Sequence, residues 1–187
     1  MRNTEKRKKI SIGVEDFKTL IDWNGYFVDK TLMIRDLIEN HAMVTLFTRP
    51  RRFGKTLNQF MIRRFFEDEI TEKGEKVDNG YLFDGLAITR CGEAIMQHQQ
   101  RYPVIFMSLK SAKQDSYDMA YASLIDEISK EFKRHAYLLQ GESLSPKEKQ
   151  EFQLVMDKEA QPIAYAKALG FLSECLTKYH GHKTIIL

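Results

Sequence analysis

Hydrophobic positions along this chain form two patterns. Short continuous runs are typical of buried strands, and three- and four-residue spacing is typical of helices. Residues 44–47 form a short apolar run with a β-branched start, which predicts a strand buried in a sheet. Residues 104–109 and 184–187 are apolar runs of the same kind. We therefore predict three buried strands, separated by segments with helical spacing.

Helical spacing of apolar residues predicts most of the remaining elements. Asp16 stands near the start of one expected helix, Thr31 is the expected cap of a second, and Ser145-Pro146 is a cap followed by a proline at the first helical position. The expected helices are residues 14–23, 31–40, 55–69, 93–101 and 116–139, one from residue 146 and one over 162–180. This order predicts an α/β fold with a parallel sheet flanked by helices. The long helical segment between the second and third strands would be an insertion that covers the site or contacts a partner.

A candidate phosphate loop lies between the first strand and the helix after it. Gly54-Lys55-Thr56 follows the strand and opens the helix, which is the order of a P-loop. Lys55 would be the catalytic cation at the β and γ phosphates, and the Thr56 hydroxyl would bind Mg²⁺. Gly54 lets the backbone approach the phosphate. The predicted nucleotide-binding residues are Arg51, Arg52, Phe53, Gly54, Lys55, Thr56 and Leu57.

Two features of this loop leave alternatives open. Arg49 stands where the usual pattern has glycine, and Pro50 fixes its own φ, so the loop is stiffer than a glycine-rich one. Arg51 and Arg52 would neutralise phosphate charge or serve a neighbouring subunit as arginine fingers. Surface salt bridges to acidic residues are an equal alternative for both.

A second motif, residues 25–31, lies upstream of the first strand. Tyr26, Phe27 and Asp29 are candidates for the adenine side of the pocket, because the segment before the first strand of a P-loop ATPase often lies against the base. The alternative is that both aromatic residues belong to the core and that Asp29 with Lys30 forms a local cap or ion pair.

These motifs resemble those of the AAA-ATPase-like proteins of bacteria and archaea. The loop Thr-Arg-Pro-Arg-Arg-Phe-Gly-Lys-Thr-Leu at residues 48–57 is similar to the hallmark of that family, in which arginine at position 49 is part of the pattern. Gly-Tyr-Phe-Val-Asp-Lys-Thr at residues 25–31 and Ile-Gly-Val-Glu-Asp-Phe at residues 12–17 resemble two further family motifs. The resemblance implies a P-loop ATPase module that uses ATP and Mg²⁺. It also implies that full-length members carry a nuclease-like domain of the PD-(D/E)XK type, which these residues do not include.

Composition narrows the class of protein. The 187 residues suffice for one domain, with 43% hydrophobic residues and a mean hydropathy of -0.43. No apolar run approaches the ~20 residues of a membrane span, and no apolar stretch follows the basic start as in a signal peptide. Cys91 and Cys175 lack metal-ligand spacing and fit a reduced cytoplasm. We predict residues 1–10 to be a disordered basic tail and residues 11–187 to be the ATPase domain.

Charge and acidic residues limit the predicted activity. A net charge of +3 does not by itself indicate nucleic-acid binding, although the basic tail leaves a nucleic-acid or protein partner open.

A P-loop enzyme needs an acidic residue after an apolar strand, and none follows residues 104–109. Residues 184–187 have the pattern of that strand cut before its carboxylates. We therefore expect a fragment that is inactive alone and incomplete at its C-terminus. The remaining candidates, which lack strand-end or ligand spacing, are Asp84, Asp115, Asp118, His41, His98, His135, His180 and His182.

Two functions remain open from the sequence. The first is an ATP-binding and ATP-hydrolysing module of a larger regulatory or nucleic-acid-associated cytoplasmic protein, either monomeric or oligomeric. The second is a non-catalytic interaction module that keeps a degenerate P-loop for its fold and binds a partner through the helical insertion.

Overall fold

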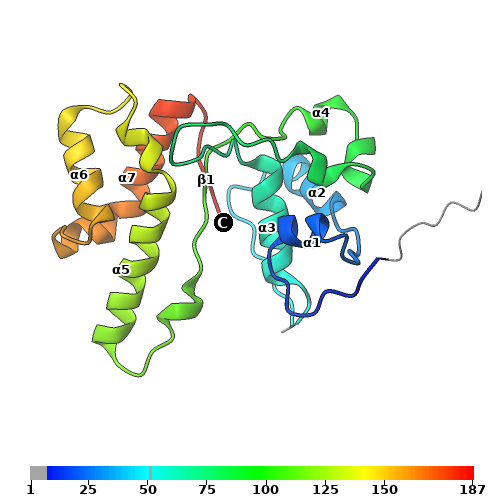
Figure 1. Ribbon diagram of the computed structural model, residues 1–187, viewed down its shortest axis with the longest axis horizontal. Coiled ribbons are helices and arrows are strands. Elements are labelled where there is room, and N and C mark those ends of the chain that lie inside the picture. The colour runs from blue at the N-terminus through cyan, green and yellow to red at the C-terminus, as the bar shows by residue number, and fades with distance from the viewer. Residues whose placement is uncertain (1–7, 51) are drawn as a thin grey trace, which may run out of the picture. The chain divides into compact units, whose positions relative to one another are not determined.

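The chain divides into two compact units, each of which is described by itself. The computed structural model describes residues 8–50 and 52–187 (Figure 1). Unit 1 consists of residues Met1–Phe66 and Asn79–Gln100, and unit 2 of Glu67–Asp78 and Arg101–Leu187. The predicted phosphate loop therefore belongs to unit 1, and both observed strands belong to unit 2.

Unit 1 is built from short helices. They are α1 (Phe17–Asp22), α2 (Leu32–Glu39), α3 (Lys55–Phe66), α4 (Glu93–Met96) and the 3₁₀ helices η1 (Gly80–Phe83) and η2 (Ala87–Arg90). The helix expected from residue 14 begins at Phe17, where Asp16 is the N-cap and its carboxylate accepts a hydrogen bond from the Thr19 N–H at 3.1 Å. Among the described residues, every helix of the chain falls short of the length and apolar content that a membrane crossing requires.

Aromatic side chains hold unit 1 together. Phe17 on α1 is fully buried, and its ring lies 5.2 Å from that of Phe27 and 5.3 Å from that of Phe83. Phe65 on α3 meets Phe83 edge-on at 5.3 Å. These contacts join α1, α3 and η1 around one core, with ring geometry that favours edge-to-face packing. The phosphate loop is thereby attached to a helix whose far end is anchored in this core.

Unit 2 contains the long helices and the sheet. Its elements are β1 (Val104–Ile105), η3 (Leu109–Ala112), α5 (Tyr117–Arg134), η4 (Ala136–Leu139), α6 (Pro146–Met156), α7 (Pro162–His180) and β2 (Ile185–Ile186). The predicted start of α6 is confirmed as a capping box between Ser145 and Glu148. Helix α7 covers the predicted residues and ends at Gly181, whose φ of 70° is left-handed.

The two strands of unit 2 pair in parallel, as predicted. Val104 lies opposite Ile185, and Ile105 lies opposite Ile186. The strand expected over residues 104–109 is shorter than predicted, because the chain turns into η3 from Leu109. The coarse prediction of an α/β arrangement with a parallel sheet is consistent with this small two-stranded sheet flanked by helices.

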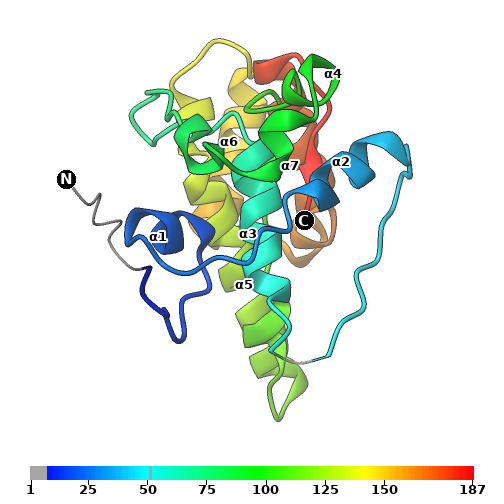
Figure 2. The ribbon, with the colours of Figure 1, turned by 90° about the vertical axis from the view of Figure 1, so that its right-hand side faces the viewer.

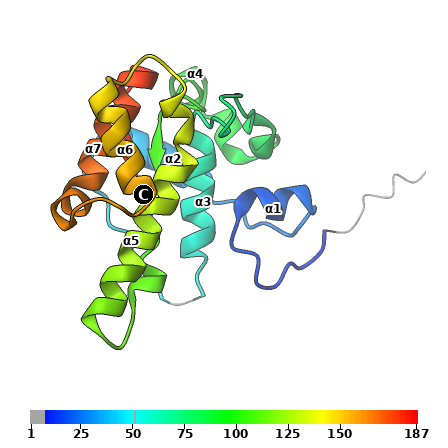
Figure 3. The same ribbon diagram turned by 60° about the vertical axis from the view of Figure 1, so that its left-hand side comes forward.

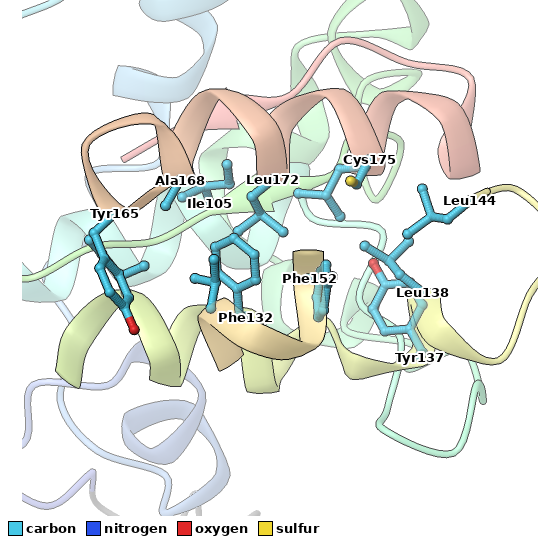
Figure 4. Close-up of a cluster of buried hydrophobic side chains, with 13 residues drawn as sticks. Ile105, Phe132, Tyr137, Leu138, Leu144, Phe152, Tyr165, Ala168, Leu172 and Cys175 are labelled. Atoms are coloured by element: carbon cyan, nitrogen blue, oxygen red, sulfur yellow. The ribbon is translucent and has the colours of Figure 1, made fainter. Parts of the chain in front are cut away.

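The residues between the two strands form the hydrophobic core of unit 2. Helices α5, α6 and α7 pack against one another and against β1 (Figures 3 and 4). Phe132 and Phe152 bring α5 and α6 together, with ring centroids 4.7 Å apart. The buried cluster comprises Ile105, Ile128, Phe132, Tyr137, Leu138, Leu144, Phe152, Val155, Tyr165, Ala168, Leu172, Cys175 and Leu176. The segment predicted as an insertion is thus the main body of this unit.

The predicted strand over residues 44–47 is wrong for this structure. Residues 44–50 lie in an extended segment that pairs with no strand among the described residues (Figure 2), and Val44, Leu46 and Phe47 are 87%, 83% and 42% exposed. Its backbone makes no hydrogen bond from Val44 to Thr48 within the part of the chain that the structure describes. An apolar run indicates a high strand propensity. A parallel strand must also pair with another strand far away in the sequence, and local composition does not specify that partner.

Three helix predictions also need correction. Thr31 occupies the N-cap position of α2, yet its side chain makes no capping bond. Helix α5 ends at Arg134 rather than continuing to residue 139, because the chain tightens into η4 after His135. Helix α4 stops at Met96, and Gln100 has a left-handed φ of 54° and donates its N–H to the Phe65 carbonyl at 2.7 Å.

Buried ionisable side chains link α5, η4 and α7. The Tyr137 hydroxyl lies 2.8 Å from His180 Nε2 and 3.2 Å from His135 Nδ1. His180 Nδ1 lies 3.2 Å from Asp68. Burial lowers the pKa of His180 although Asp68 opposes the shift, and burial together with Arg134 lowers the pKa of His135. Both rings are therefore neutral in the folded protein at pH 7.

These two histidines predict a loss of stability in mild acid. Because their folded pKa values lie below the ordinary 6.5, the unfolded chain takes up protons first as the pH falls. We expect the free energy of unfolding, measured by urea titration, to decrease from about pH 7 to about pH 5. The charged groups that act on these rings are Asp68, Lys76, Glu67, Glu131 and Arg134.

Matched variants identify the source of this pH dependence. The double variant His135→Gln/His180→Gln should flatten the dependence, whereas His41→Asn, at an exposed position with φ of 48°, should leave it unchanged. A wild-type stability that is constant over this pH range would contradict the assignment.

Candidate functional site

The predicted phosphate loop forms a left-handed turn in front of α3. Arg52 and Gly54 have φ values of 68° and 71°, and Phe53 between them does not have a positive φ. Turns that contain left-handed residues are the kind of backbone in which successive N–H groups can face an anion together. A Cβ on Gly54 would meet nothing within 4 Å, so glycine is needed here for its conformation rather than for space.

Helix α3 begins at Lys55, directly after this turn. The Asn58 N–H donates to the Gly54 carbonyl at 2.9 Å and closes the first helical turn. The N–H groups of Thr56 and Leu57 donate to no acceptor within residues 8–50 and 52–187. Unpaired N–H groups and the helix dipole together favour a negative ligand at this point.

The Lys55 side chain curls back over its own loop. Its ammonium group donates to the Arg49 carbonyl at 2.5 Å and lies 3.4 Å from the Pro50 carbonyl. The charge is therefore held on the loop side of the helix, where a phosphate would be bound. The sequence could not predict these two acceptors, because every residue has a main-chain carbonyl and its use does not depend on the residue type.

The remaining predicted loop residues lie around this turn. Arg52 and Phe53 are exposed, whereas Thr56 and Leu57 are half-buried. Arg52 forms no ion pair with any residue that the structure describes. Arg51, the other candidate phosphate or finger arginine, lies outside the described residues. The first turn of α3 contains no acidic side chain, so the local charge from the loop is positive.

The second predicted motif makes structural contacts. Asp29 accepts hydrogen bonds from the Thr31 N–H at 2.8 Å, the Thr31 hydroxyl at 2.6 Å and the Ala87 N–H at 2.7 Å. The Thr31 hydroxyl in turn accepts from the Ile88 N–H at 3.1 Å. Burial raises the pKa of Asp29, but these hydrogen bonds and the nearby Arg90 outweigh it and lower the pKa overall. Asp29 thus ties the start of α2 to η2.

The aromatic residues of that motif differ in their surroundings. Phe27 packs edge-on against Phe17, and Tyr26 is 62% exposed while its N–H donates to the Lys9 carbonyl at 2.7 Å. Lys9, predicted to lie in the tail, pairs with Gly25 in a parallel bridge. Among the described residues, no hydrogen bond, ion pair or ring contact joins Tyr26, Phe27 or Asp29 to the phosphate loop.

Close backbone approach explains the glycine of the second motif. A Cβ on Gly25 would lie 2.4 Å from Leu20 Cδ1 and 2.9 Å from the Leu20 carbonyl oxygen. The Gly25 N–H donates to that carbonyl at 2.8 Å, which holds the turn against the end of α1. Through Gly25 the motif therefore packs against the end of α1, and through Asp29 it joins the start of α2 to η2.

The donor set of the loop fits a phosphate better than a bare metal ion. Lys55, the left-handed turn and the open N–H groups are suited to an anion. Thr56 offers one hydroxyl oxygen for Mg²⁺, which takes most of its other ligands from phosphate and water. No cluster of three His, Cys, Asp or Glu side chains is found among the described residues. The loop therefore fits Mg²⁺ only together with a bound nucleotide.

Comparison with known proteins identifies the family. The sequence profile of the family described as predicted AAA-ATPase matches residues 11–187, and the chain belongs to that family. Comparison with curated proteins gives no match, and comparison with solved structures gives none either.

Replacement of Asp29 separates its structural contacts from a role in binding. We expect Asp29→Ala to lower the free energy of unfolding by about 1–3 kcal/mol, because the Thr31 and Ala87 N–H groups lose their acceptor. The measurement is urea unfolding with and without ATP. Asp84→Ala, at an exposed carboxylate, is the matched control and should leave stability within about 0.5 kcal/mol. An Asp29→Ala protein of unchanged stability but weaker ATP binding would instead place Asp29 at the adenine.

Proposed function

Given its place in the predicted AAA-ATPase family, we propose that this chain is an ATP-binding module whose phosphate site is the loop around Gly54, Lys55 and Thr56. The observation that carries the proposal is the combination at the start of α3. A left-handed turn, unpaired helix N–H groups and a lysine held over the loop meet at one point. Each favours a phosphate, and together they match the motif that defines the loop in the sequence.

Lys55 has a direct part in this binding. Its ammonium group is bonded to two main-chain carbonyls, which carry partial rather than full negative charges. Phosphate oxygens attract an ammonium group more strongly than carbonyls do, because they carry full negative charge and the two ions attract each other as well as forming hydrogen bonds. Binding of the β and γ phosphates would therefore draw Lys55 away from Arg49 and Pro50 and toward the nucleotide.

Mg²⁺ would be held by the Thr56 hydroxyl and the phosphates, and when bound it supplies positive charge that offsets the charge on the γ-phosphate. Arg52 is exposed beside the same loop and adds a further positive charge within reach of a phosphate. The Arg51 side chain would act with it if the sequence-based assignment holds.

We further propose that the full-length parent of this chain hydrolyses ATP by attack of water on the γ-phosphate, as the family description suggests, with the water-activating acid supplied from outside these residues. Lys55 would stabilise the charge that develops on the transferred group. The proposal that this module belongs to a larger regulatory or nucleic-acid-associated protein rests on the family resemblance.

Removal of the Lys55 ammonium tests the binding proposal. We expect Lys55→Ala to weaken ATP binding by about 10- to 100-fold, since a charge-assisted contact worth about 1.5–3 kcal/mol is lost. Isothermal titration calorimetry measures this affinity directly. Lys73→Ala, which removes an exposed lysine from a polar turn, controls for the change in net charge and should leave affinity unchanged. Equal ATP affinity of wild type and Lys55→Ala would reject the proposal and favour the non-catalytic interaction module.

A further inference from the structure

Strand β1 has two edges, and β2 uses one of them. The Ile185 N–H donates to the Pro103 carbonyl at 3.0 Å, and the Leu187 N–H donates to the Ile105 carbonyl at 2.9 Å. The Met107 N–H donates to the Leu187 carbonyl at 3.0 Å. In a parallel ladder alternate residues serve opposite neighbours, so the polar groups of Val104 and Phe106 point to the other, outer edge.

Side chains of α5 occupy that outer edge. The Phe106 N–H donates to Glu131 Oε1 at 2.7 Å, and Arg134 Nη2 donates to the Val104 carbonyl. One residue of a neighbouring parallel strand, opposite Ile105, would make the same pair of bonds by donating to Val104 and accepting from Phe106. Glu131 and Arg134 together take the place of such a residue, because Glu131 supplies its acceptor and Arg134 supplies its donor.

The same edge is also covered just before the strand begins. Glu67 forms a parallel bridge with Tyr102, and the Asp68 N–H donates to the Tyr102 carbonyl at 2.9 Å. The Glu67 side chain then pairs with Arg134. The outer edge is thus covered by backbone hydrogen bonds at Tyr102 and by side-chain hydrogen bonds at Val104 and Phe106.

We propose that Glu67, Glu131 and Arg134 form an edge cap that takes the place of a strand on the outer side of β1. Exposed strand edges promote pairing with other chains, and native proteins block them. The edge cap blocks β1 by satisfying its outward polar groups with the buried Glu131 carboxylate and the partly buried Arg134 guanidinium. Within the described residues, the sheet then remains open only at β2, where Ile186 is 56% exposed.

Charge and burial make the edge cap persistent. Glu67 and Glu131 are 1% and 5% exposed, and both carboxylates pair with the Arg134 guanidinium, whose Nε lies 3.0 Å from Glu131 Oε2. Burial raises the pKa of Glu131, but the His135 ring 3.4 Å away and the hydrogen bonds from Arg134 outweigh it and bring the pKa to about 2. An ionised carboxylate is an acceptor only, so Glu131 always presents a partner to the Phe106 N–H.

Hydrogen exchange of single amides tests the edge cap in the intact chain. In wild type the Phe106 amide should be protected like the Met107 amide, which is bonded to β2. In Glu131→Leu we expect Phe106 to exchange about tenfold faster relative to Met107, because only Phe106 loses its acceptor. The same variant should self-associate in sedimentation velocity as its protein concentration rises.

Two further variants keep the test decisive if Glu131→Leu folds poorly. Glu131→Gln retains a side-chain oxygen as acceptor, so the ratio of Phe106 to Met107 exchange should stay as in wild type even if overall stability falls. Glu127→Leu removes a surface ion pair from the same helix and should alter neither this ratio nor the association state. An unprotected Phe106 amide in wild type, or equal acceleration of both amides in Glu131→Leu, would overturn the proposal.

Discussion

Satisfaction of backbone polar groups is the constraint on which both units depend. In unit 2 the outward groups of β1 find their partners in Glu131 and Arg134, so a two-stranded sheet is stable beside three helices. In unit 1 the Asp29 carboxylate serves N–H groups from segments far apart in the sequence. At the start of α3 the chain provides no such partner for the Thr56 and Leu57 N–H groups within its described residues.

This contrast gives the phosphate loop its chemical character. A buried N–H without an acceptor costs free energy, whereas an exposed one at a helix N-terminus is available to a ligand. Among the described residues, Lys55 is bonded to main-chain carbonyls and to no carboxylate, so no described acidic side chain neutralises its charge. The loop is therefore electrostatically incomplete without an anion. That is the physical basis for assigning nucleotide binding to it.

Sequence patterns predicted the elements whose signals are local. The Asp16 cap, the capping box at Ser145 and the left-handed end of α7 at Gly181 all depend on residues within one helical turn. The parallel direction of residues 104–105 and 185–186 agrees with the parallel sheet predicted from the alternation of apolar runs and helices, although the pairing of these two strands was not predicted. Local signals failed at residues 44–47, where strand composition was read correctly but the pairing partner is not a local property.

The long-range polar contacts had no sequence signal at all. Nothing in the spacing of Glu67, Glu131 and Arg134 indicated that they meet, because the first lies far from the others along the chain. Asp29 was considered for the adenine side or for a local cap, and its bond to Ala87, 58 residues away, was not anticipated. Buried polar partners are chosen by tertiary packing, so they become visible only when the elements are in place.

The most direct test of the central claim is an amide chemical-shift titration of the chain with ATP and Mg²⁺. If the turn before α3 binds phosphate, the amide signals of residues 53–57 will move saturably, and they will move less with adenosine, which lacks phosphates. The amide of Gly181, at the end of α7, serves as the internal reference. Signals of residues 53–57 that stay fixed while ATP reaches millimolar concentration would contradict the account.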